Sequence, residues 1–81
     1  MRRSKAFAEA LKKVRLKKGI TRAELARRVG CTYLNVWFWE TGRHYPRGHV
    51  LVRLFEIFPE LVEAIKHEEG NGNGAKRENR R

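Results

Sequence analysis

The apolar positions of this chain recur with the spacing of an α-helix, and no alternating strand pattern appears between them. The first set, at i, i+3, i+4 and i+7, is Phe7, Ala10, Leu11 and Val14. Lysines lie off this stripe, so residues 5–18 are predicted to form an amphipathic helix. Gly19 is expected to end it, because glycine readily adopts the left-handed conformation that closes a helix.

A second helix is predicted directly after Gly19. Thr21 followed by Glu24 is a capping box, in which the hydroxyl and the carboxylate each satisfy an unpaired amide. The helix is therefore expected from Arg22 to about Val29. Its predicted inner face is Leu25, Ala26 and Val29.

A third helix is predicted from Tyr33 to about Thr41, with Thr32 as its N-cap and Gly42 at its end. Gly30 supplies the end of the second helix, which leaves a connection of only about three residues. Two short helices joined in this way have helix-turn-helix geometry.

Two more helices are predicted after a loop over residues 43–48. The fourth would bury Val50, Leu51, Leu54, Phe55 and Phe58, and Pro59 would break it. The fifth is expected from about Glu60 to Glu69. Residues 70–81 begin with alternating Gly and Asn and have nothing to bury, so they are expected to form a disordered, basic-ended tail. The predicted fold class is all-α, with a compact five-helix domain over residues 1–69.

The charge of the chain is strongly basic and unevenly distributed. Lys and Arg total 19 against 9 Asp and Glu, for a net charge of +10. Residues 1–53 carry 14 basic and 3 acidic side chains, whereas residues 54–74 carry one and five. A field of this kind suits a polyanionic partner, and nucleic acid is the first candidate. The alternative is a basic surface that only keeps the protein soluble.

The sequence offers little material for catalysis or metal binding. Cys31 is the only cysteine, which fits a reducing compartment, and Ser4 is the only serine. Asp is absent, and His44, His49 and His67 have no Cys or acidic partners at ligand spacing. No apolar run is long enough to span a bilayer. We therefore expect no enzyme activity, no metal, no cofactor and no membrane contact.

Several anchor residues now combine into a family pattern: the run from Gly19 to Ala26, then Val29 and Gly30, Val36, the run from Trp39 to Arg43, and Pro46. In order and spacing they resemble the Cro and cI type (XRE, lambda-repressor-like) helix-turn-helix family over roughly residues 7–58. The resemblance implies five helices, a helix-turn-helix unit at about residues 21–41, and a third helix that enters the major groove of double-stranded DNA. It also implies a transcriptional regulator of phage-repressor type, in the cytoplasm of a bacterial cell or a phage-infected host.

The resemblance also assigns roles to individual residues. The family positions that reach bases or nearby phosphates correspond to Thr32, Tyr33, Leu34, Trp37 and Phe38. Phosphate contacts are implied for Arg22, Thr32, Arg43, His44 and Arg47. At Arg22 the family usually has Gln, so a stronger but less oriented contact is expected. An ion pair between Arg15 and Glu40 is implied to tie the first helix to the third.

At the positions expected to contact bases, the side chains differ in chemistry from those that the family usually has. The family usually has Gln, Asn, Ser or Arg there, whereas this chain has Leu34, Trp37 and Phe38. Apolar side chains contact thymine methyl groups, but the same cluster has the composition of a protein-binding hot spot. The alternative function is therefore a protein-interaction module that uses this face to bind polymerase or another regulator. A further alternative is that these aromatic residues belong to the core.

The apolar residues of the fifth predicted helix also allow two interpretations. They either form a two-fold contact in a homodimer or close the core of the monomer. The residues concerned are Leu61, Val62 and Ile65.

Overall fold

The computed structural model describes residues 3–73, and the side chains of residues 5–69. The described residues form five α-helices and no strand, so the predicted all-α class is confirmed. The helices are α1 (Arg3–Lys17), α2 (Arg22–Val29), α3 (Tyr33–Glu40), α4 (Gly48–Ile57) and α5 (Leu61–Asn73).

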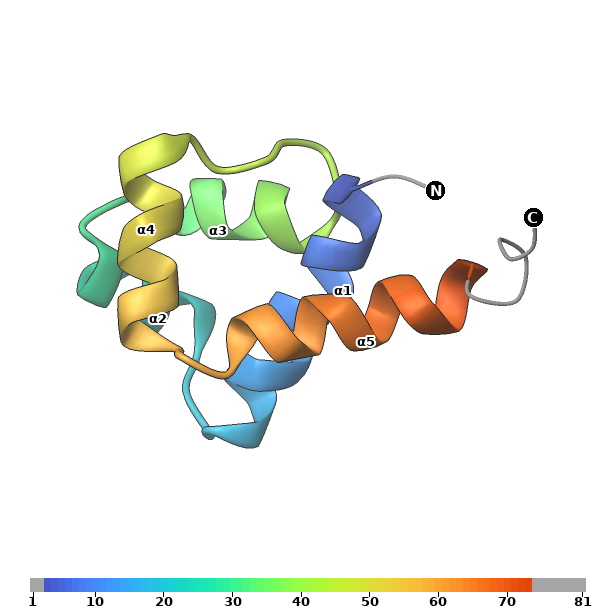
Figure 1. Cartoon of the computed structure of the whole chain (residues 1–81). Coiled ribbons are helices and arrows are strands. Elements are labelled where there is room, and N and C mark those ends of the chain that lie inside the picture. Colours follow the sequence, from blue (N-terminus) through green and yellow to red (C-terminus); the bar gives the residue numbers. More distant parts are fainter. Residues whose placement is uncertain (1–2, 74–81) are drawn as a thin grey trace.

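Helix α1 is central to the packing. It contacts both α3 and α5, while α2 contacts α3 and α4. Figure 1 shows the arrangement of the five helices. The largest fully buried side chains come from all five helices and the residue that follows α4: Phe7, Leu11, Leu25, Val36, Leu54, Phe58 and Leu61. The predicted inner faces of α1 and α2 therefore line a common core, with Val29 only partly buried at its edge.

The N-terminus of α2 forms only half of the predicted capping box. The Thr21 hydroxyl accepts a hydrogen bond from the Glu24 amide at 3.0 Å, as expected. The Glu24 carboxylate, however, binds Arg27 and accepts a hydrogen bond from Arg28 Nε at 3.0 Å. The predicted bond from the Glu24 carboxylate back to the amide of the N-cap was therefore wrong. Two guanidinium groups one turn away offer stronger, charge-assisted bonds than a neutral amide. The hydrogen bond from Arg28 lowers the pKa of Glu24.

Gly30 makes the sharp turn between α2 and α3. Its φ of 87° is left-handed, and its amide donates to the Ala26 carbonyl at 2.8 Å. A Cβ at this position would meet nothing within 4 Å, so the need for glycine comes from the backbone alone. The turn therefore depends on a residue without a Cβ.

Gly30→Ala is expected to lower the free energy of unfolding by about 1–2 kcal/mol, the cost of the left-handed region for an L-residue. Chemical denaturation followed by circular dichroism measures this loss. The matched control is Gly48→Ala, because Gly48 begins α4 without a positive φ and also has open space at its Cβ. That variant should be neutral or slightly more stable. Equal losses of stability for the two variants would contradict the account of this turn.

The last helix is longer than the sequence predicts. The expected end at Glu69 was wrong, since α5 continues to Asn73. Each added residue of an existing helix gains one backbone hydrogen bond, and glycine in a helix costs only about 1 kcal/mol relative to alanine, so Gly70 is a weak stop signal. Residues 74–81 of the predicted tail lie outside the described residues.

Helix α5 closes the core by packing along α1. Leu61 is fully buried and Ile65 packs against the core, whereas Val62 remains exposed. Lys18 Nζ lies 3.0 Å from Glu60 Oε2, which adds a surface ion pair between the α1 end and the start of α5. Of the two interpretations of this apolar set, closure of the monomer core therefore accounts for most of it.

Candidate nucleic-acid interface

Helix α3 projects one face out of the domain and buries the other. Thr32 caps it, since its hydroxyl accepts a hydrogen bond from the Asn35 amide at 3.2 Å. Val36 and Trp39 are buried, whereas Tyr33 is 48% and Leu34 57% exposed. This register agrees with the helical spacing of the sequence, and it excludes the alternative in which the whole aromatic cluster belongs to the core. Trp37 and Phe38 are half-buried at the edge of the outward face.

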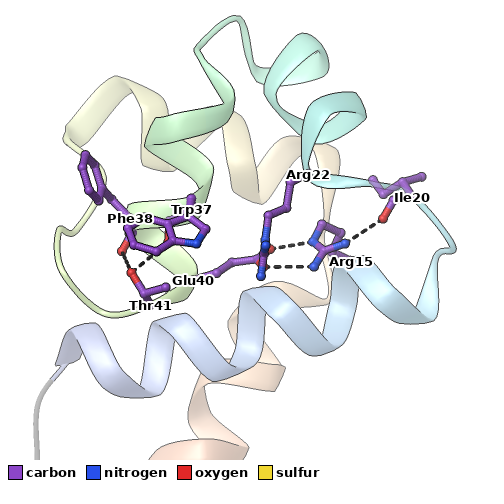
Figure 2. A network of polar contacts seen from close by, with 7 residues as sticks. All are labelled: Arg15, Ile20, Arg22, Trp37, Phe38, Glu40 and Thr41. Carbon is purple, nitrogen blue, oxygen red and sulfur yellow. Dashed lines mark hydrogen bonds and ion pairs between the residues drawn. The ribbon is translucent and has the colours of Figure 1, made fainter.

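The inner edge of α3 is held by a group of three charges, of which Arg15 and Glu40 are buried and Arg22 is half-buried. Arg15 donates from Nε to Glu40 Oε2 at 2.6 Å and from Nη2 to Oε1 at 3.0 Å. The expected pair is therefore bidentate, and Arg15 Nη1 also donates to the Ile20 carbonyl at 2.9 Å. A second guanidinium, from Arg22, reaches the same carboxylate (Figure 2). The distance between Arg22 Nε and Glu40 Oε1 is 2.9 Å. The Glu40 side chain has no exposed surface.

Sequence reasoning missed this bond of Arg22. The hydrogen bond to Glu40 raises the pKa of Arg22 and holds its guanidinium in place. The Arg22 side chain is therefore held between α2 and α3, while its contact with phosphate stays a prediction. One clue to this bond was present in the sequence, because a carboxylate such as Glu40 accepts hydrogen bonds from two guanidinium groups at once. Spacing along the chain gave no hint, since the pair is 18 residues apart.

A second cluster joins the end of α3 to the following loop. The Arg43 guanidinium lies 5.4 Å from the centre of the Trp37 ring, within range of a cation–π interaction. The His44 ring meets Phe38 edge-on at 4.7 Å between centroids, and Phe38 lies 5.5 Å from Trp37. Arg47 is exposed at the N-cap of α4 and lines the same hollow as His44. The packing of these loop side chains on aromatic rings was not predicted from the sequence.

The structure thus brings the two predicted sets of contact residues to one region. Arg22 reaches Glu40 of α3 from α2, and the loop side chains Arg43 and His44 pack on the rings of α3. Between them the apolar side chains of α3 protrude. The result is an apolar helix face bordered by basic side chains, an arrangement suited to a groove lined by phosphates.

Neither a metal-binding group nor a membrane-spanning helix is found among the described residues. No three His, Cys, Asp or Glu side chains of residues 5–69 come together as a group able to hold a metal. None of the described helices is both long and apolar enough to cross a membrane.

The short α2–α3 connection and the protruding second helix of the pair define a helix-turn-helix domain. A protein family described as a helix-turn-helix domain matches residues 6–58, which is more than half of the chain, and the chain belongs to this family. The assignment agrees with the resemblance to the Cro and cI type. No curated protein and no solved structure matches the chain significantly. Membership places the chain among helix-turn-helix proteins of the DNA-binding class.

Proposed function

We propose that the chain is a transcriptional regulator of phage-repressor type, which binds duplex DNA sequence-specifically and acts as a binder and not as an enzyme. In this proposal α3 lies in the major groove and α2 crosses the phosphate backbone. The observation that carries it is the outward face of α3, where Tyr33 and Leu34 protrude from a helix whose other face is fully packed.

The contacts follow from the places of the side chains. Leu34, Trp37 and Phe38 would meet base edges, with Tyr33 at the flank of the helix. The phosphates would be held by Arg22, Arg43, His44 and Arg47, and by Thr32 at the positive N-terminus of α3. Phosphate contacts fix position, and base contacts supply sequence preference.

The buried charges support this role by making α3 rigid. Glu40 ties the last turn of α3 to α1 through Arg15 and to α2 through Arg22. A recognition element must hold its side chains to within a fraction of an ångström, and packing on fixed helices achieves this. The same bond orients Arg22 beside Tyr33 at the start of the reading helix.

The phosphate role predicts a change in salt dependence. Arg47→Ala and Arg43→Ala should each weaken binding to any duplex and lower the slope of log K against log salt by about 0.9 for each phosphate that is no longer neutralised. Fluorescence anisotropy titrations of a labelled duplex at several salt concentrations measure both effects.

The matched control for these variants is Lys66→Ala, which removes one exposed positive charge from α5. It should leave the slope unchanged, because α5 packs along α1 and is not part of the proposed interface. An equal reduction in slope for all three variants would mean that only the overall charge attracts DNA.

A second candidate function is favoured by the composition of the same face. Exposed Tyr and Leu, together with half-buried Trp and Phe, form an apolar and aromatic surface of the kind that protein-binding hot spots use. In this alternative, α3 docks on a protein such as polymerase or another regulator, and the basic charge aids the encounter. DNA affinity would then not depend on the outward residues of α3.

A further inference from the structure

The outward face of α3 has few groups that can make hydrogen bonds to base edges. The one carboxylate of the helix, Glu40, is buried against Arg15 and Arg22. The Thr41 hydroxyl, at the end of the helix, donates to the Trp37 and Phe38 carbonyls at 2.9 and 3.2 Å (Figure 2). Its donor is therefore already used within the helix.

The remaining amide side chain of the helix, Asn35, is exposed but lies to one side of this face. Asn35 is about 100° around the helix from Leu34, and it lines the hollow between α3 and the following loop, beside His44 and Arg47. Neither a carboxylate nor an amide therefore stands at the centre of the outward face, where Leu34 lies with Phe38 at the edge. The centre of the face therefore lacks the carboxylate and amide side chains that usually contact the amino groups of adenine and cytosine.

One feature of the major groove does match an apolar helix face. Among the base edges, only a pyrimidine C5-methyl group is apolar, and thymine presents it in every A·T pair. Leu34 is 57% exposed, so it has apolar surface to bury on such a methyl group. The side chains around it favour DNA as the occupant, because Arg43 is anchored on Trp37 and His44 on Phe38 at the edge of the apolar surface.

We propose that α3 reads pyrimidine C5-methyl groups through Leu34 and Phe38, so that sequence preference comes from apolar contact instead of a hydrogen-bond code. The proposal rests on the DNA-binding function proposed above and names what that site recognises. Thymine and 5-methylcytosine both carry this methyl group in the same position of the groove. The preferred DNA site is a run of base pairs in which C5-methylated pyrimidines face the first turns of α3.

The test uses the full chain and the best duplex recovered from a random pool, prepared with thymidine and again with deoxyuridine, which lacks only the methyl group. The deoxyuridine duplex should bind about fourfold more weakly for each contacted methyl group that is removed, as expected for the burial of one carbon group. A third duplex, with 5-methylcytosine at the contacted positions, is compared with its cytosine form to distinguish the two sources. A gain on methylation identifies the methyl group alone as the feature that is read, and no gain restricts the readout to thymine.

Two variants separate methyl contact from general loss of binding. Leu34→Ala should reduce the difference between the thymidine and deoxyuridine duplexes, because the exposed apolar side chain is gone and alanine suits the helix. Arg47→Ala should weaken both duplexes and leave their ratio unchanged. Equal binding of the two duplexes by the unmodified chain overturns the methyl proposal while DNA binding stands. Failure to recover any bound duplex overturns the proposed function, and the methyl proposal with it.

Discussion

Replacing Glu40 by alanine should remove a large part of the stability of the domain. The substitution leaves Arg15 buried and Arg22 half-buried, close together and with no carboxylate between them. Removing one partner from a buried ion pair costs about 3–5 kcal/mol, because the remaining charge keeps its desolvation penalty. Small domains have a total stability of about 5–15 kcal/mol, so this loss is a large part of the whole.

Urea denaturation followed by circular dichroism measures the effect. The control is Glu63→Ala, which removes a carboxylate whose side chain is 80% exposed and lies 3.9 Å from Lys66. This control should unfold at the same urea concentration as the unmodified chain, because exposed pairs contribute little. Comparable midpoints for the two variants would show that the buried charges do not hold α1, α2 and α3 together.

A negative charge on the outward face of α3 should abolish DNA binding without unfolding the domain. Leu34→Asp places a carboxylate in the groove, where it faces phosphates and base acceptors. Like charges brought together at an interface cost several kcal/mol, so affinity for the preferred duplex should fall by roughly 100-fold or more. Titration of a labelled duplex measures the affinity, and circular dichroism verifies the fold.

The control for this variant is Val62→Asp, a substitution of the same kind at an exposed apolar residue of α5. It changes the net charge by the same amount and should alter affinity only slightly. If Leu34→Asp bound DNA like this control, the α3 face would not contact DNA. The protein-interaction module would then be the better account of the domain.

Local signals explain why the α2–α3 unit is predictable from the sequence. Thr21, Gly30 and Thr32 act on their own neighbours, through a side-chain cap or a left-handed turn, and they fix the start of both helices. The apolar spacing then determines that Val36 faces inward and Leu34 outward. Each of these features is determined by residues within one helical turn.

The features that were missed depend on contacts between distant segments. Nothing near Arg22 in the sequence reveals that it shares the Glu40 carboxylate with Arg15, because the sharing depends on how three helices cross. The placement of His44 on Phe38 likewise depends on the path of the loop. The base and phosphate contacts depend on a DNA partner. They are therefore predicted from the sequence and tested by a binding experiment.

The most direct test of the central claim is selection of bound duplexes from a random DNA pool at about 150 mM salt, where nonspecific attraction is already weakened. The account predicts enrichment of a defined motif, and a palindromic motif would show that two copies bind together. Its enrichment should disappear for Leu34→Asp and persist for Val62→Asp. Weak binding without a motif, erased by salt, would contradict sequence-specific recognition by α3 and direct the search to a protein partner of the same face.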